Sequence, residues 1–151
     1  MLSPLQLRQH SFQEVAIKVV DAGTAEGEVT FEQQFACAFA IDNPLMWRGD
    51  LRVTIVSERE KPFSYSGVIA IRGIFEIHPA FPEARREDLI KVNGAGILFG
   101  AIREMVLTVT SRSLKGPLLL PTLNFQQAEE ENQSLRARSK KHDRPSVAKR
   151  V

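Results

Sequence analysis

The sequence has a single cysteine and no motif for metal, nucleotide or nucleophilic chemistry. Because Cys37 is alone, one chain cannot form a disulfide or a cysteine-based metal site. The three histidines stand far apart in the sequence, and no glycine-rich phosphate loop or catalytic triad pattern is present. We therefore expect no cofactor, no metal and no enzymatic activity, and we expect Cys37 to be buried and unreactive.

Long apolar runs are also absent. No uninterrupted apolar run approaches the roughly 20 residues that a membrane-spanning helix needs. The N-terminal residues MLSPLQLRQH lack the basic start and the apolar block of a secretory signal. These absences favour a cytoplasmic protein that does not insert into a membrane.

An excess of charge of one sign is found only near the C-terminus. Residues 129–151 hold seven Lys or Arg and four Asp or Glu, whereas residues 1–128 hold 13 and 14. A basic patch of the kind that binds nucleic acid is therefore not indicated in the first 128 residues. We expect no nucleic-acid partner.

Four segments before residue 78 alternate apolar and polar residues, which is typical of β-strands. They cover residues 5–20, 29–41, 51–55 and 63–77. The first segment does not keep one phase, which predicts a bulge or bend near residues 9–11. In the fourth, Gly67 predicts another bulge and Gly73 predicts a close backbone approach.

The second of these segments has two distinct faces. Large apolar side chains, among them Phe35, Phe39 and Ile41, share one parity. The other parity changes from polar residues to Ala36, Ala38 and Ala40. The alanine-rich half suits a second, flatter contact.

Residues 85–113 are expected to form one long helix with a break or kink near Gly94. From Ile97 onward, apolar residues recur at spacings of three and four. Gly96 and Gly100 lie one turn apart and permit a close contact with another backbone. Four consecutive strands followed by a helix predict an α+β fold with an antiparallel sheet.

The chain after the helix divides into two parts. Prolines at positions 117 and 121 exclude a helix, so residues 117–125 are expected to be extended and held on the domain by leucines. Residues 126–151 are polar and basic, with a possible short helix over 126–138 and otherwise the composition of a flexible tail. We therefore expect a domain over residues 1–125 and a tail over residues 126–151.

The predicted domain has more apolar surface than one helix can cover. The fourth strand is apolar on both faces, the second strand has its alanine-rich face, and residues 118–125 are rich in leucine. Apolar surface of this extent is expected to serve oligomerisation, partner binding or both.

Four short stretches of the sequence resemble the SecB protein-export chaperones. They are GIFEI at 73–77, ILFGAIRE at 97–104, SR at 111–112 and LLLPTLNF at 118–125. The order of four strands and a long helix is also similar, so the resemblance extends over roughly residues 5–125.

The resemblance implies a function and an assembly. Members of that family are ATP-independent holdases that bind unfolded precursor polypeptides in long apolar grooves and keep them export-competent for the SecA motor of the Sec translocase. They are homotetramers, dimers of dimers, with helices between two sheets. The residues carried over to the client groove are Tyr65, Val68, Ala70, Leu118, Leu119, Leu120, Leu123 and Phe125. Those carried over to the oligomer interface are Ile97, Leu98, Ile102, Met105, Val106 and Val109.

The chain departs from that family in three respects. Lys18 and Val68 occupy positions at which the export chaperone presents acidic residues to SecA. The residues after Phe125 are polar rather than apolar, and the tail is basic. A SecB-like chaperone dedicated to one client, such as the antitoxin of a toxin–antitoxin system, is therefore an alternative.

An enzyme is the remaining alternative. A long helix wrapped by an antiparallel sheet also describes thioesterase-like hot-dog domains. Such an enzyme would need an acidic residue or a histidine at the start of the helix, facing the helix of a partner subunit. Glu87, Asp88 and Asn93 are possible candidates, but no motif supports them.

Overall fold

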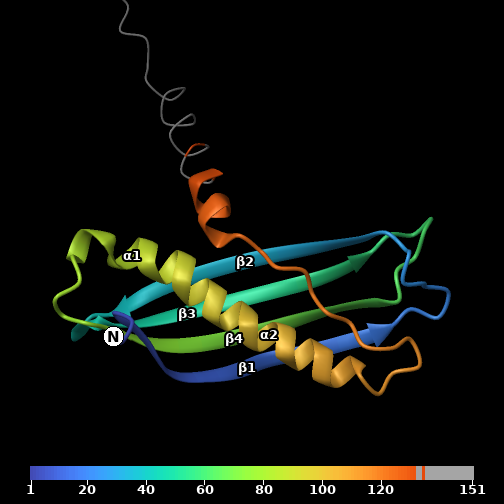
Figure 1. The fold of residues 1–151 in the computed structure, drawn as a ribbon, viewed down its shortest axis with the longest axis horizontal. Coiled ribbons are helices and arrows are strands. Elements are labelled where there is room, and N and C mark those ends of the chain that lie inside the picture. Colours follow the sequence, from blue (N-terminus) through green and yellow to red (C-terminus); the bar gives the residue numbers. More distant parts are fainter. Residues whose placement is uncertain (132–133, 135–151) are drawn as a thin grey trace, which may run out of the picture.

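The first half of the chain forms four long antiparallel strands in the computed structural model, which describes residues 1–131 and 134. The strands are β1 (Leu5–Val19), β2 (Val29–Ala40), β3 (Asn43–Ser57) and β4 (Tyr65–Ile77). They lie in the order β1-β4-β3-β2, so that β1 and β2 are the edges of the sheet (Figure 1). The predicted antiparallel sheet is confirmed. The third strand is longer than predicted because Ala40 pairs with Asn43 and the two residues between them form the whole turn.

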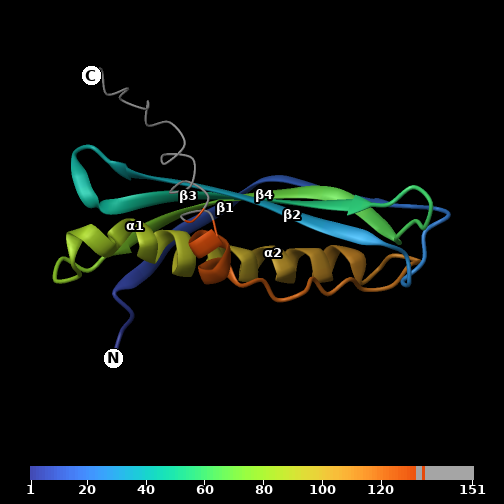
Figure 2. The same ribbon diagram turned by 90° about the horizontal axis from the view of Figure 1, so that it is seen from above.

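One continuous helical segment follows the sheet. It consists of a 3₁₀ turn, η1 (Glu83–Arg85), helix α1 (Arg86–Leu89), a π-helical turn, η2 (Ile90–Gly94), and helix α2 (Ala95–Thr110). The break predicted near Gly94 is thus present as a π-helical turn, which leaves the segment helical throughout. The segment runs obliquely across one face of the sheet, from the β2 edge to the β1 edge (Figure 1), and Figure 2 shows the sheet and the helix as two layers.

The length and composition of this segment, Glu83–Thr110, would also allow it to cross a membrane. One third of its most apolar window is buried within the chain. Ile90, Leu98 and Ile102 are fully buried against the sheet. A helix that covers a core passes the same test of length and hydropathy, so the test alone is weak evidence for a membrane span.

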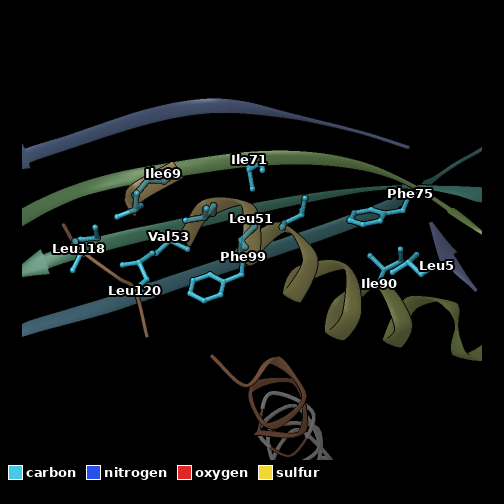
Figure 3. Packing of buried hydrophobic residues seen from close by; sticks show 14 of the residues in the cluster. Leu5, Leu51, Val53, Ile69, Ile71, Phe75, Ile90, Phe99, Leu118 and Leu120 are labelled. Carbon is cyan, nitrogen blue, oxygen red and sulfur yellow. The ribbon is translucent and has the colours of Figure 1, made fainter. Parts of the chain in front are cut away.

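The core lies between the sheet and the helical segment (Figure 3). Odd-numbered residues of β3 and β4 point toward the helix, because successive side chains of a strand point to opposite faces. The fully buried side chains include Leu51, Val53, Ile69, Ile71 and Phe75 from the sheet and Ile90, Leu98, Ile102 and Val106 from the helical segment. The opposite face of the sheet is covered by no other element among the described residues, and we call it the open face.

Two glycines of β4 are required by close contacts. A Cβ on Gly67 would lie 2.1 Å from the carbonyl oxygen of Ala16, and a Cβ on Gly73 would lie 2.7 Å from Cδ2 of Leu98. The close approach predicted at Gly73 is present, but it is made by the side chain of Leu98 and not by a backbone. The bulge predicted at Gly67 is wrong, because β4 pairs with both neighbours in unbroken register there. The irregularity predicted in β1 is present as two register shifts, between Leu7 and Gln9 and between Phe12 and Glu14.

Residues 117–124, which we call the strap, return in extended conformation across the helix-covered face toward β2 (Figure 1). Leu118 and Leu120 are buried in the core, whereas Leu119 between them is 63% exposed. The extended segment anchored by leucines is confirmed. Residues 125–131 form a short helix, and the remainder of the predicted tail, 132–133 and 135–151, lies outside the described residues.

The neighbouring leucines of the strap give the first prediction. Leu120→Ala should lower the free energy of unfolding by about 2–5 kcal/mol, because it opens a cavity in the core. Leu119→Ala should change it by less than about 0.5 kcal/mol, because that side chain is exposed. Urea denaturation followed by circular dichroism measures both, and equal values for the two variants would contradict the packing of the strap.

Candidate functional site

Three exposed apolar areas adjoin the helix layer: the outer side of α2, the strap and the end of β2. Their most exposed large side chains are Phe39, Ile41, Ile97, Leu107, Val109 and Leu119. Contiguous apolar surface that a chain leaves exposed marks a site for another polypeptide or for a second copy.

A shallow groove of about 740 Å³ separates α2 from the end of the strap. We call it the strap groove. Its helix side includes Val92, Gly96 and Ile97, and its strap side includes Leu123 and Phe125. Apart from the neighbouring helix backbone, no atom lies within 4 Å of the position that a Cβ on Gly96 would take, so the glycine keeps the groove wide on the helix side.

Three side chains hold the strap in place. Thr110, buried at the end of α2, donates its hydroxyl hydrogen to the carbonyl oxygen of Val106 at 2.7 Å and accepts the N–H of Leu118 at 2.8 Å. The Nε of Arg103 donates to the carbonyl oxygen of Leu120 at 3.1 Å. The hydroxyl of Tyr65 donates to the carbonyl oxygen of Gly116.

Gly116 immediately precedes the strap and has a φ of +80°. This left-handed conformation favours glycine, because a side chain there would clash with its own backbone. The turn and the three hydrogen-bonded side chains together set the path of the strap along the groove.

The strap ends in a capped helix. The Oδ1 of Asn124 accepts the backbone N–H groups of Gln126 at 3.1 Å and Gln127 at 3.2 Å, which is the arrangement of an N-cap. The ring of Phe125 packs edge-on against Phe99, with 5.7 Å between the ring centroids. The end of the strap groove is therefore fixed on the domain by an aromatic contact.

A cluster of charges joins this last helix to η2. The Nζ of Lys91 lies 2.7 Å from Oε1 of Glu87 and 3.3 Å from Oε1 of Glu129. The hydrogen bond to Glu87, with a smaller contribution from Glu129, raises the pKa of Lys91 against the opposing effect of burial. Lys91 therefore stays charged at neutral pH and connects the two helices.

Cys37 lies near this cluster on β2. Burial raises the pKa of its thiol, Glu87 and Glu129 raise it further, and Lys91 opposes them. The thiol is half-buried and stays protonated at neutral pH, which agrees with the predicted unreactive cysteine.

A second hollow, of about 540 Å³, lies between α1 and the helix over residues 125–131. It brings together Asp88 and Asn93 beside Leu89, whereas Glu87 is paired with Lys91. Within residues 1–131 and 134, no group of three or more His, Cys, Asp or Glu side chains is placed to hold a metal ion.

The residues predicted to contact a client lie in three different places. Leu123 and Phe125 line the strap groove, and Leu119 is exposed on the strap. Val68 and Ala70 lie on the open face, on the other side of the sheet, where Val68 is half-buried and Ala70 is buried. The prediction is wrong for three residues that are buried in the core of the chain, Tyr65, Leu118 and Leu120.

The residues predicted for the oligomer interface also fall into a buried group and a more exposed group. Leu98, Ile102 and Val106 are completely buried against the sheet, so they belong to the core of a single chain and not to a contact between chains. Ile97 and Val109 are exposed, and Met105 is half-buried. An interface over these three residues stays a prediction.

The open face carries paired charges. Asp50 lies between Arg48 and Arg72, with its carboxylate oxygens 3.1 Å and 2.6 Å from their Nε atoms. Glu14 pairs with Arg52, and Glu76 pairs with Arg8. These acidic residues of the open face are therefore partly neutralised by arginine, and Lys18 and Val68 add no negative charge.

Sequence reasoning missed the residues that hold the strap. Thr110 and Arg103 bind backbone groups of the strap, and such contacts leave no periodic pattern in a sequence. The pairing of Glu87 with Lys91 was visible as a spacing of four residues on a helix, whereas Glu129 lies 38 residues farther along the chain.

No protein-family model matches this chain, and no curated protein matches it in sequence. Among solved structures, it is similar to the SecB-like chaperone Rv1957 of Mycobacterium tuberculosis, solved in complex with a ChAD peptide from the Rv1956 HigA1 antitoxin. The two share 20% identity over 80% of this chain and 91% of that chain, with a TM-score of 0.55. A protein of unknown function from Streptococcus agalactiae shares 18% identity over 78% of this chain and 97% of that chain, with a TM-score of 0.46. The likeness to Rv1957 shows that this chain has the fold of a SecB-like chaperone.

The buried hydroxyl of Thr110 gives the second prediction. Thr110→Val should lower the free energy of unfolding by about 1–3 kcal/mol and release the strap, because the N–H of Leu118 loses its acceptor inside the core. Limited proteolysis should then cut within residues 117–124 faster than in the parent protein. Thr108→Val is the control, because Thr108 is exposed on the same helix; if both variants were cut at the parental rate, the strap would not depend on Thr110.

Proposed function

We propose that this protein, which has the fold of a SecB-like chaperone, is an ATP-independent holdase that binds unfolded polypeptides. The strap groove is the observation that carries the proposal. It joins apolar side chains of α2 and the strap on a rigid support, and it is open along its length, as an extended client requires. The cytoplasm is the proposed compartment.

The chaperone would bind either many different clients or one dedicated client. A general holdase would keep precursors export-competent and pass them to SecA. A dedicated chaperone would bind one client, such as an antitoxin. Two observations favour the dedicated form: Rv1957 was solved with an antitoxin peptide, and the carboxylates of Glu14, Asp50 and Glu76 on the open face are paired with arginines.

The proposal includes self-assembly through the outer side of α2. Leu107 and Val109 are exposed there beyond the strap groove, and apart from the neighbouring helix backbone no atom of the chain lies within 4 Å of a Cβ built on Gly100. Glycine on an outward helix face allows the backbone of a second copy to approach closely. A dimer of dimers would bury this face. No catalytic role is proposed for Glu87, Asp88 or Asn93.

Client binding gives the third prediction. The protein should bind reduced, carboxymethylated α-lactalbumin, a permanently unfolded chain, equally well with and without ATP. Leu123→Ser should raise the Kd by about ten- to a hundredfold, because a lost apolar side chain contact is worth about 1.5–3 kcal/mol. Leu114→Ser is the matched control, since Leu114 is fully exposed in the turn before the strap and does not line the groove.

Isothermal titration calorimetry measures these constants. Absence of binding by the parent protein would refute the holdase proposal, and an equal effect of both variants would refute the strap groove as its site. A peptide from one antitoxin that binds more than a hundredfold more tightly than unfolded α-lactalbumin would favour the dedicated form.

Assembly gives the fourth prediction. Light scattering should report four times the chain mass of 16.9 kDa for the parent protein. Gly100→Arg should give a smaller species with unchanged helix content, because the new side chain enters open space in one chain but a close contact in the oligomer. Gln34→Arg, on the exposed edge strand, should leave the mass unchanged. A parent protein with the mass of one chain would contradict the proposed assembly.

A further inference from the structure

The two edges of the sheet are protected to different degrees. A free edge strand presents unpaired N–H and C=O groups to any other extended chain, and proteins block such edges with bulges, charges or prolines. β1 has two register shifts and carries Arg8, Glu14 and Lys18. β2 pairs with β3 in unbroken register from Val29 to Phe39. Only β2 therefore offers a long regular edge.

The second half of β2 lacks the charged residues that block pairing with another strand. Its first half carries Glu32, Gln33 and Gln34, whereas residues 35–41 contain no charge and no proline. We call residues 35–41 the β2 tip. Phe39 is 55% exposed and Ile41 is 99% exposed. Residues 35–39 keep the regular pairing of β2 with β3, the register shifts between Phe39 and Ala40, and Ile41 lies in the turn that follows β2. An uncharged, apolar edge with such a regular stretch attracts another strand.

Hollows adjoin the β2 tip on both faces of the sheet. On the helix-covered face, a hollow of about 270 Å³ lies between Phe39, Trp47 and the start of the helical segment. On the open face, a hollow of about 290 Å³ is lined by Ala38, Ala40, Met46, Arg48 and Ile74, and also by Phe39 and Trp47. Both hollows are thus next to the same stretch of free edge.

The helix-side hollow also has charged residues in part of its wall. Glu83, Arg86 and Glu87 of the helical segment line it together with Phe39, Pro44 and Trp47.

We propose that the β2 tip binds an extended apolar segment of an unfolded polypeptide, which adds to the sheet as a fifth strand. Side chains of an added strand point alternately to the two faces, so successive residues enter the helix-side hollow and the open-face hollow. The backbone pairing tolerates any sequence, and the two hollows select large apolar side chains at neighbouring positions. This inference rests on the proposed holdase function and places a second part of the client beyond the strap groove.

The hollows favour a client over a second copy of this chain. If two β2 tips paired with each other, the side chains brought to the open-face hollow would be those of Ala36, Ala38 and Ala40. A methyl group is too short to fill a hollow of about 290 Å³. Leucine, isoleucine or phenylalanine from a client segment would fill it.

The test uses a fluorescent nine-residue peptide rich in leucine and valine, with the full-length protein. Ala38→Lys should weaken its binding at least tenfold, because the lysine places a charge at the mouth of the open-face hollow. Thr30→Lys is the matched control, since Thr30 is exposed on the same face of the same strand but within its polar half. That control should change the Kd less than twofold.

Backbone methylation of the peptide tests the strand pairing itself. Methyl groups on the amides of one peptide edge should change the Kd less than threefold, because the other edge can still pair. Methyl groups on both edges should raise the Kd at least tenfold. If the fully methylated peptide binds as tightly as the parent peptide, or if Ala38→Lys and Thr30→Lys act alike, strand addition at the β2 tip is wrong.

Two further outcomes separate this inference from the proposed function. If unfolded α-lactalbumin binds normally but the peptide is insensitive to both changes, the holdase proposal stands and the β2 tip fails. If Ala38→Lys reduces the mass measured by light scattering, the β2 tip is a contact between copies of this chain, which overturns its assignment to a client.

Discussion

The structure depends on a mismatch between the width of a four-stranded sheet and the width of one helix. Strands lie about 4.8 Å apart, so the sheet is roughly 19 Å wide including its edges, whereas a helix with its side chains covers a stripe of about 10–12 Å. One oblique helical segment therefore leaves part of the apolar face uncovered (Figure 1). The strap covers much of the remainder with Leu118 and Leu120. The strap groove lies between the helical segment and the end of the strap.

The strap groove can bind a ligand only if both of its walls, the helical segment and the strap, are held firmly. The helical segment is held by a row of completely buried side chains, and the strap is held by hydrogen bonds from Thr110, Arg103 and Tyr65. Apolar side chains on the walls then stay exposed, because neither wall can move to bury them. The exposed leucines and aromatic residues are thus a consequence of the rigid support, and the same support makes them suitable for unfolded chains.

The sequence predicted the elements of this fold well, because their signals are local. Alternation in β2 and β4 and the three- and four-residue spacing after Ile97 depend only on neighbouring residues. Burial was predicted less well. Leu98, Ile102 and Val106 were assigned to a contact between chains, and Leu118 and Leu120 to the client groove, although all five are in the core. The sequence shows that a residue is apolar, but it does not show whether that residue packs in the core of one chain, against a second copy or against a client.

The sequence also did not show which strands would lie at the edges of the sheet. Phe39 shares a parity with the helix-covered side of β2, yet it is 55% exposed because β2 is an edge strand, and Ile41 is exposed because it lies in the turn that follows β2. The order of strands in a sheet is set by pairing over long distances in the chain. The β2 tip therefore became visible only in the folded structure.

The central claim is that this fold offers unfolded polypeptides two apolar binding surfaces, the strap groove and the β2 tip. Hydrogen–deuterium exchange of the full chain, with and without saturating carboxymethylated α-lactalbumin, tests it most directly. The account predicts slower exchange in residues 35–41 and 117–126 and unchanged exchange in β1. Saturated binding that leaves both segments unprotected would contradict it.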